Sequence, residues 1–477
     1  MDLLLTHGYF LYEDPKELQV MKPYPPLGIL YISSHLRARG FSVEVFDSTF
    51  SSRQELFALL NSGPPAVLGV YANLMTRRNV LDILRVAKNA GWKTVVGGPE
   101  PAAYIEEYLD AGADAVAIGE GEITLEDLIP AFRVGKVGSS ESLQALGRID
   151  GIAFRTADGS VFQTPPRARI PDIDAQPWPD REAIDIGLYV KTWRKSHGQG
   201  SVSFITARGC AYHCRWCSHG VFGKTHRRRK PASVVDEVEW LIDRYHPDMA
   251  WIADDVFTIH PRWLDLYAAE VKRRGLKLPF ECISRADRLG PQVMDTLAGL
   301  GCFRIWIGSE SGSQRVLDAM ERGVTVEQVQ AAVSLAKSRG IKTGMFLMWG
   351  YHGEGLEDIE ATIEHVKRSD PDVFLTTVSY PIKGTPYFEE VSSRLVSAKT
   401  WAEGSDRDYL IRGRHSRHFY QFADHLLRSE VELHRLRNAT DCPAGAPPSD
   451  TLTLARLEGE IRLARAGLQT SFEEVEA

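Results

Sequence analysis

Residues 208–217 read RGCAYHCRWC, and this stretch holds three of the chain's six cysteines within eight positions. It follows the segment Val202 to Ile205, whose residues predict a strand. Three thiols so close together in a cysteine-poor chain indicate a metal site in a reducing compartment rather than a disulfide framework. Cys210, Cys214 and Cys217 are therefore the predicted metal ligands.

Three local thiolates suit an iron–sulfur cubane, because a cubane with three protein ligands leaves one iron open for a substrate or cofactor. The competing interpretation is a zinc site with His213 or His219 as the fourth ligand. Zinc motifs usually pair two short knuckles, and this sequence has one. The remaining cysteines, Cys282, Cys302 and Cys442, stand singly and are expected to be buried apolar thiols.

The 477 residues are 43% hydrophobic and 25% charged, which is typical of globular proteins and long enough for two domains and a tail. The net charge of −7 offers no broad attraction for nucleic acid. No apolar run approaches the ~18 residues of a membrane helix, and the first residues lack the basic region of a signal peptide. We expect a cytoplasmic protein without nucleic-acid or membrane partners.

The one basic run spans His226 to Lys230. Charge runs are usually solvated, so the first expectation is an exposed patch. A local contact to an anion or a cofactor is the alternative.

Residues 1–130 alternate strand-like and helix-like patterns. Strands are predicted at residues 3–5, 43–47, 67–71, 94–96 and 115–118, and helices at 27–39, 80–89 and 102–111. This alternation predicts an α/β domain with a Rossmann-like, doubly wound parallel sheet. Ligands of such sheets lie beyond the carboxyl ends of the strands. We therefore expect one crevice surrounded by residues 6–21, 72–77, 97–101 and 119–122.

The alternation restarts at residue 201 and predicts six β/α units, hence a partial (β/α)6 TIM-like barrel with its site at the strand carboxyl ends. The stretch before it is rich in proline and is predicted as a linker with a hairpin around Asp158-Gly159. The expected organisation is a Rossmann-like domain at 1–130, a linker at 131–200, the barrel at 201–392 and a helical C-terminal tail at 393–477, with a loop at 443–448.

The cysteine loop, with an aromatic residue (Trp216) before its third cysteine, resembles that of the radical S-adenosylmethionine (SAM) superfamily. The resemblance covers residues 200–390. In that family the open iron of a [4Fe–4S] cluster chelates SAM, and electron transfer cleaves SAM to a 5′-deoxyadenosyl radical that abstracts hydrogen. The resemblance implies the cluster, SAM and an electron donor such as flavodoxin or ferredoxin.

The same resemblance assigns SAM contacts at the strand ends. Asp254 or Asp255 would accept hydrogen bonds from the SAM ammonium, and the guanidinium fork of Arg285 would fit its carboxylate. The full implied set is Trp216, Asp254, Asp255, Arg285, Ser309, Glu310, Gly344, Met345 and Phe346. Helix caps at the acidic positions and a surface ion pair at Arg285 are the alternatives. One departure is the turn at 350–355, GYHGEG, where relatives usually show Gly-x-Pro-Gly-Glu-Thr.

Three segments of the first domain, residues 22–28, 96–101 and 119–122, look like those of the cobalamin-binding subgroup. Glycines at strand ends let the backbone approach a large flat ligand. No Asp-x-His-x-x-Gly motif follows the first strand, and Glu100 stands where relatives often carry histidine. The resemblance implies cobalamin as a cofactor; a retained fold that shapes a substrate pocket is the alternative.

The favoured hypothesis is cobalamin-dependent C-methylation of a small natural product. The first alternative is cobalamin-independent dehydration or deoxygenation of an aminoglycoside or polyol, and the second is a non-catalytic zinc-binding protein. Four acidic residues at loop ends would suit a cationic substrate of the first alternative, namely Glu100, Asp254, Asp255 and Glu354. The candidates for substrate contact or proton donation are Tyr212, Tyr351, His352 and Lys383.

Overall fold

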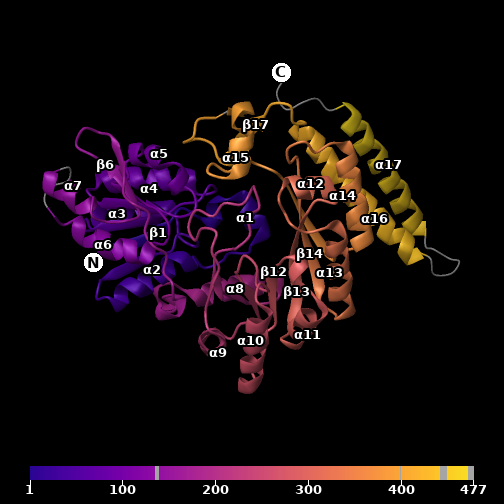
Figure 1. Ribbon diagram of the computed structural model, residues 1–477, viewed down its shortest axis with the longest axis horizontal. Helices are drawn as coiled ribbons and strands as arrows, with labels where there is room; N and C mark the ends of the chain where they lie inside the picture. Colours follow the sequence, from indigo (N-terminus) through magenta and orange to yellow (C-terminus); the bar gives the residue numbers. More distant parts are fainter. Residues whose placement is uncertain (135–138, 398, 441–447, 471–477) are drawn as a thin grey trace.

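A computed structural model shows the N-terminal domain, the barrel and the C-terminal helices following one another along the long axis of the molecule (Figure 1). The structure describes residues 1–134, 139–397, 399–440 and 448–470. Cys442 and all but the last residue of the loop predicted at 443–448 lie outside these ranges. None of the described helices combines the length and the apolar run that crossing a bilayer requires.

The first sheet has seven strands in the order β2-β1-β3-β4-β5-β6-β7. Strands β1 to β5 pair in parallel, which confirms the predicted doubly wound sheet. Because β2 and β3 flank β1, the chain changes direction across the sheet there, and a ligand crevice is expected at the carboxyl ends beside this point. The strands are β1 Leu3–His7, β2 Val43–Phe46, β3 Val67–Tyr71, β4 Lys93–Gly97 and β5 Ala115–Ala117.

Both faces of this sheet are buried under helices, which explains the nearly continuous apolar strands. Leu4 packs on one face with the core under α3, α4 and α5, and Leu3 and Leu5 pack on the other face under α2 and α6. Helix α3 was not predicted, although Ser52 and Glu55 form a capping box at its start. The helices are α1 Pro15–Val20, α2 Leu27–Ala38, α3 Arg53–Ser62, α4 Arg77–Asn89, α5 Ile105–Asp110 and α6 Gly121–Ala131.

Residues 131–200 hold more regular structure than a linker. The hairpin predicted around Asp158-Gly159 is present, and its strands β6 Ile152–Arg155 and β7 Val161–Gln163 extend the first sheet in antiparallel fashion. Gly159 takes the left-handed conformation, with a φ of 84°, in the turn between them. Helices α7 Ser140–Leu146 and α8 Ile186–His197 flank the hairpin in the sequence.

The second sheet has six parallel strands in the order β15-β14-β13-β12-β11-β8, which confirms the predicted partial barrel. A two-stranded ladder of β9 and β10 follows β8 and carries the cysteine loop between its strands. The strands are β8 Ser201–Phe204, β9 Ala207–Arg208, β10 Arg227–Arg228, β11 Met249–Ile252, β12 Phe280–Ser284, β13 Cys302–Glu310, β14 Lys342–Trp349 and β15 Val373–Val378.

Most helices of the barrel pack on the outer face of its sheet. Alternate strand residues such as Cys282, Ile305 and Met345 pack with these helices in one core. Figure 1 shows α11, α13 and α14 on the side of the sheet away from the N-terminal domain. The helices are α9 Pro231–Tyr245, α10 Pro261–Arg274, α11 Pro291–Gly299, α12 Gln314–Ala319, α13 Val326–Ser338 and α14 Leu356–Ser369.

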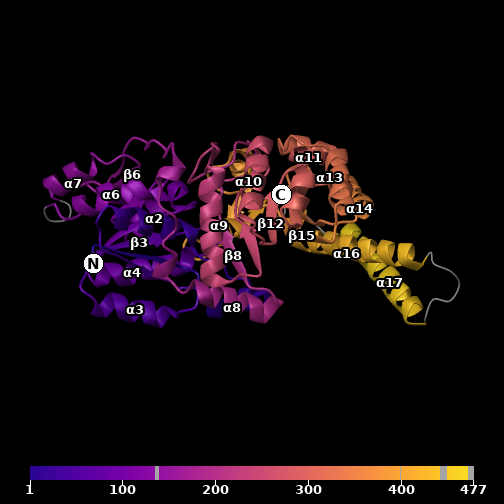
Figure 2. The ribbon, with the colours of Figure 1, turned by 90° about the horizontal axis from the view of Figure 1, so that it is seen from below.

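The C-terminal region is mainly helical, as predicted. Figure 2 shows α16 and α17 side by side beyond α14, far from the N-terminal domain. Their apolar residues form a core with β14 and α14. The elements are α15 Pro386–Val391, β16 Leu395–Ser397, β17 Tyr409–Ile411, α16 Arg417–Thr440 and α17 Pro448–Thr470.

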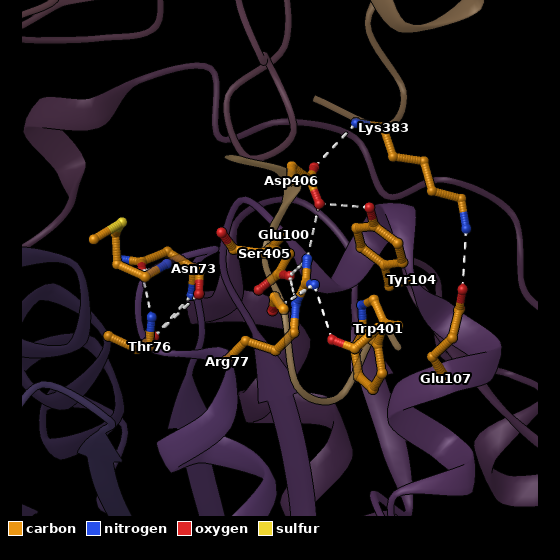
Figure 3. A network of polar contacts seen from close by, with 12 residues as sticks. Asn73, Thr76, Arg77, Glu100, Tyr104, Glu107, Lys383, Trp401, Ser405 and Asp406 are labelled. Carbon is orange, nitrogen blue, oxygen red and sulfur yellow. Dashed lines mark hydrogen bonds and ion pairs between the residues drawn. The ribbon is translucent and has the colours of Figure 1, made fainter. Parts of the chain in front are cut away.

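A buried ion-pair network, here called the latch, joins the N-terminal domain to the segment after the barrel (Figure 3). Its centre is Arg77, whose side chain is 3% exposed and pairs with Glu100 and, at 2.9 Å, with Asp406. The Tyr104 hydroxyl donates to Asp406 at 2.6 Å, and the Tyr108 hydroxyl donates to Glu100 at 2.8 Å. Two acids from different parts of the chain thus share one guanidinium.

Backbone carbonyls complete the latch. Arg77 donates to the carbonyls of Trp401 and Gly404, both at 3.1 Å. Lys383 pairs with Glu107 at 3.1 Å and lies 4.3 Å from the centre of the Tyr104 ring. Lys383, a predicted substrate contact, therefore belongs to this junction.

The latch predicts a large effect of removing its cation. We expect Arg77→Met to destabilise the protein by about 3–5 kcal/mol, because two buried carboxylates would lose their shared cation. Urea unfolding followed by circular dichroism measures this. Arg85→Met is the matched control, since the Arg85 side chain is 68% exposed and its pair with Asp82 should contribute no more than about 1 kcal/mol. Equal losses in the two variants would contradict the role of the latch.

Candidate functional site

A cavity of about 520 Å³ lies between the first sheet and the cysteine loop. Its volume is in the usual range for ligand pockets. Strand ends and helix starts of the N-terminal domain form one wall, and residues 205–223 with Asp255 form the other. Of the four predicted loops, residues 97–99 and 119–122 line it, whereas 6–21 and 72–77 do not. The start of α2 takes their place, through Pro25 to Ile29.

Glycines keep the N-terminal wall thin. Gly98 has a φ of 122°, and a Cβ there would lie 2.3 Å from the Ala72 carbonyl oxygen. A Cβ on Gly28, at the start of α2, would meet no atom within 4 Å. The rest of this wall is largely apolar, as a large flat cofactor such as cobalamin requires. Among the described residues, no histidine of the N-terminal domain lines the cavity.

The cysteine loop brings the predicted metal ligands to the opposite wall. Cys210 lines the cavity, Cys214 is buried and Cys217 is exposed. Burial raises the pKa of Cys210, and the pKa of Cys217 is raised to about 12 by the packing around its sulfur and then by Cys214, Asp255 and Cys210. Neutral thiols are favoured until a metal displaces their protons.

The three thiols do not converge on one point. Among the described residues, no three His, Cys, Asp or Glu side chains gather closely enough to hold a single ion. A cubane offers each thiolate a different iron, so it tolerates this spacing, whereas a zinc ion needs its ligands within about 2.3 Å of one centre. The donor set therefore fits an iron–sulfur cluster better than zinc.

Two arginines face the buried cysteine. The Nη1 atoms of Arg285 and Arg322 lie 3.9 Å and 3.8 Å from Cys214 Sγ. Arg285 also pairs with Asp287 at 2.9 Å and covers the Tyr212 ring at 3.7 Å. Arg285, which was predicted to bind the SAM carboxylate, is thus buried beside a thiol and does not form a surface ion pair. Tyr212, a predicted substrate contact, is its stacking partner.

The two neighbouring acids at the end of β11 have different surroundings. Asp254 is buried and accepts hydrogen bonds from the backbone N–H groups of Thr206 at 2.6 Å and Ala207 at 3.2 Å. Asp255 is exposed and lines the cavity. Packing around its carboxyl, followed by the charge of Asp254, raises the pKa of Asp255. The structure thus places Asp255, and not Asp254, on the cavity wall.

Glu310 ends β13 in the left-handed region, with a φ of 63°. Such backbone is costly for a residue other than glycine and often marks functional sites. Its carboxylate lies 3.7 Å from Arg322, and burial raises its pKa. Ser313 caps α12, so Glu310 is no helix cap. The Ser309 hydroxyl lies 2.9 Å from His365, inside the protein.

The three SAM contacts predicted on β14, Gly344, Met345 and Phe346, alternate between the two faces of the sheet. Met345 is fully buried in the outer core. Gly344 and Phe346 face the other way, and a Cβ on Gly344 would lie 2.4 Å from the Trp306 ring. Phe346 stacks on Trp306 with ring centres 5.1 Å apart. The inner face of the barrel is therefore aromatic at this level.

A carboxyl group within the turn at residues 350–355 holds the two ends of the turn together. Glu354 is buried and accepts a hydrogen bond from the Gly350 N–H. Burial raises the pKa of Glu354 to about 8. Tyr351 is buried against Tyr387 with ring centres 4.6 Å apart, in a cluster that also contacts Trp216. His352 lies at the surface and pairs with Glu390 at 2.7 Å. None of these three lines the cavity.

The basic run at residues 226–230 is not a solvated patch, so that expectation is wrong. Arg229 pairs with Glu237, and Arg228 lies 3.2 Å from Asp254. Arg227 and Arg208 both bind Glu120 at 2.8 Å, and Arg208 also binds Glu122 at 2.6 Å. The three arginines of the run are internal cations that hold the cysteine loop to its surroundings, whereas Lys230 is exposed.

Arg208, Glu120 and Arg322 were not predicted as site residues. Arg208 stands one glycine before Cys210, and Glu120 lies in the glycine-rich segment at 119–122, so the position of each was a signal. The sequence carries no such signal for Arg322, because its contact with Cys214 depends on the fold. The structure places Arg208 and Glu120 on the cavity wall and Arg322 beside Cys214.

An α/β enzyme with a cofactor cavity between a doubly wound sheet and a cysteine loop is the class that this geometry defines. The radical SAM superfamily model matches residues 204–366, and the B12-binding domain model matches residues 19–129. The chain belongs to the radical SAM superfamily, in the group whose barrel follows a B12-binding domain, and it is a radical SAM enzyme.

Individual proteins agree with this assignment. An uncharacterized methyltransferase of Pyrococcus horikoshii is 28% identical over 403 residues, which cover 82% of this chain and 84% of the relative. The anaerobic magnesium-protoporphyrin IX monomethyl ester cyclase of Rubrivivax gelatinosus is 25% identical, with 78% and 67% covered. The radical SAM methyltransferase TsrM of Kitasatospora setae, solved with cobalamin and a [4Fe–4S] cluster, shares the fold with a TM-score of 0.67 at 20% identity, with 84% and 78% covered.

The cysteine loop predicts an all-or-none loss of iron. We expect alanine at Cys210, Cys214 and Cys217 together to abolish the roughly four irons per chain that anaerobic reconstitution should give. Iron and sulfide analysis measures this. The buried pair Cys282→Ala and Cys302→Ala is the control and should keep its iron. One zinc per chain in the unaltered protein would contradict the cluster.

Glu354 predicts a pH-dependent stability. Its pKa of about 8 in the folded protein exceeds the ordinary 4.5, so the folded state holds the proton more tightly. The free energy of unfolding should therefore fall as the pH rises from about 5 to 8, by up to about 1.4 kcal/mol per pH unit from this residue. We expect Glu354→Gln to flatten this fall in urea titrations at pH 5, 6.5 and 8. The exposed Glu357→Gln is the control, and identical slopes in all three proteins would exclude the effect.

Proposed function

We propose that this enzyme transfers a methyl group from cobalamin to a carbon atom of a small natural product. The observation that carries the proposal is the shared cavity, which joins the glycine-rich strand ends of the B12-binding sheet to Cys210 and Asp255. Methyl transfer requires both cofactors to reach one substrate, and a shared cavity permits that. Methyltransferases among the similar proteins support the same reaction.

The bound groups would supply a hydrogen-abstracting radical, from the cluster with SAM, and a methyl group, from cobalamin. The chain's own residues hold and shield them. Cys210, Cys214 and Cys217 would hold the cluster, and Arg285 and Arg322 would offset its negative charge. Asp255 and Glu310 would orient SAM by accepting hydrogen bonds from its ammonium and its ribose hydroxyls. The functional units in this proposal are residues 1–130 and 201–392.

The electron would come from a small protein such as flavodoxin or ferredoxin, in keeping with a cytoplasmic enzyme. Cys217 is exposed, so one side of the cysteine loop is open to a protein donor. The substrate would be held from the other side of the loop, where the cavity and the inner face of the barrel lie.

The alternative of an aminoglycoside or polyol substrate was supported by four acidic residues that would attract a cation, and most of these acids have other partners. Of the four acids that suggested a cationic substrate, Glu100 is bound in the latch and Asp254 holds backbone N–H groups. Glu354 is buried with its proton favoured below pH 8. Only Asp255 of this set lines the cavity.

The proposal predicts that filling the cavity weakens cobalamin binding and leaves SAM cleavage intact. We expect Gly28→Leu to weaken hydroxocobalamin binding about tenfold or more, because the new side chain would occupy cavity space without straining the backbone. Gel filtration with cobalt absorbance measures retention. Gly299→Leu is the matched control, since its Cβ also meets no atom within 4 Å but lies outside the cavity.

Product analysis tests the reaction itself. With SAM and a reductant, we expect S-adenosylhomocysteine beside 5′-deoxyadenosine, and only the former should depend on added cobalamin. Normal 5′-deoxyadenosine formation by a protein that neither retains nor needs cobalamin would favour the cobalamin-free alternative and refute methyl transfer.

A further inference from the structure

The inner face of the barrel sheet carries an aromatic floor, defined here as Trp306 on β13 and Phe346 on β14. Their strand neighbours Ile305, Ile307 and Met345 pack under the outer helices, so the two rings project from the opposite face. Figure 1 shows the N-terminal domain on that side of the sheet. The floor thus lies between the two domains rather than in the core under the helices.

Trp306 is held in place by three neighbours. Its ring is stacked on Phe346 at 15° with centres 5.1 Å apart, and its indole N–H donates to Glu281 at 3.0 Å. Gly344, the partner of Trp306 across the ladder, leaves room for the ring, since a Cβ there would lie 2.4 Å from it. Arg304 also pairs with Glu281, at 3.2 Å. The indole is therefore pre-organised, as binding sites require.

The floor is only partly covered. Trp306, Phe346 and Trp251 are half-buried, while Leu375 on the last strand is 49% exposed and Tyr24 of the N-terminal domain is 41% exposed. In a closed barrel, layers of side chains fill the interior. The barrel sheet has six strands rather than a closed ring, and these apolar groups keep part of their surface exposed. Exposed apolar groups gathered in this way mark interaction sites.

The same strand leads from the floor to the cluster loop. Trp306 and Glu310 are four residues apart on β13, hence about 13 Å along the strand. Glu310 lies 3.7 Å from Arg322, which in turn lies 3.8 Å from Cys214 Sγ. A molecule that rests on the floor would span the distance to the cofactors, which is the position that a substrate must take.

From this arrangement we infer that the substrate carries a planar aromatic ring system, which extends the stack formed by Trp306 and Phe346. Offset stacking of flat rings adds to the burial of their area, whereas a puckered sugar or polyol gains little on such a surface. Glu281 and Arg304 lie at the edge of the floor, where they can select polar groups on the ring. As a statement about the substrate, this inference depends on the proposed function.

The test compares two probes that differ in planarity, 2-naphthol and its saturated analogue decahydro-2-naphthol. Equilibrium dialysis against the enzyme reconstituted with its cluster and hydroxocobalamin measures both dissociation constants. We expect the enzyme to prefer 2-naphthol at least about fivefold, as one good stacking contact allows. Trp306→Leu should remove the preference, and Gly344→Ala should weaken it because the methyl group would displace the indole.

Phe162→Leu is the matched control, because Phe162 is 45% exposed on β7 in the other domain, and it should keep the preference. Phe346→Leu provides a milder second variant if Trp306→Leu fails to fold. Equal binding of the two alcohols, or a preference that survives Trp306→Leu and Phe346→Leu, would overturn the inference. The dialysis is independent of methyl transfer, so the cobalamin and product assays can fail while this test succeeds, or succeed while it fails.

Discussion

Two parallel sheets can serve one cofactor cavity only if their carboxyl ends are held facing each other, and buried ion pairs impose that orientation here. On one side of the junction Glu120 binds Arg208 and Arg227, from the two strands that carry the cysteine loop. On the other side Arg77 holds Glu100 and Asp406. A rotation that separated the domains would leave charges buried without partners, which costs several kcal/mol for each pair. Apolar contacts alone would allow one domain to slide over the other, whereas these ion pairs fix the position of the two domains relative to each other.

The cysteine loop adds a second electrostatic demand, since three thiolates and the acids Asp255 and Glu310 gather near one place. Arg285 and Arg322 supply compensating positive charge from the barrel side, close to Cys214. Their positions depend on backbone detail: Gly308 leaves room for the Arg322 guanidinium, because a Cβ there would lie 2.6 Å from Nη2. The barrel strands thus support the cluster through cations as well as through their packing.

Much of the fold could be predicted from sequence because its strands are apolar runs of regular length between helices of regular period. Strand β3 begins and ends at the predicted residues, and helix α2 begins at its predicted residue and ends one residue early. Helix α3 was not predicted because its residues RQELFALLNS have a weak apolar pattern. The hairpin β6–β7 could be predicted only in part because β7 is exposed. The cysteine loop was evident from spacing alone, since it is local. Arg322 and the latch could not be found in this way, because the partners of Arg77 lie 23 and 329 residues away along the chain.

The acids at the strand ends show why residue type alone leaves function ambiguous. A carboxylate beside free backbone N–H groups can bind a ligand's cation or close a turn, and both uses favour the same positions. Asp254 and Asp255 are adjacent just beyond β11, yet their carboxylates have different partners. Asp254 fixes the end of β8 through Thr206 and Ala207, and Asp255 reaches the cavity. The same division separates Met345 from Phe346 on β14. Of two neighbouring residues of similar type, the fold thus assigns one to the scaffold and leaves the other available for chemistry.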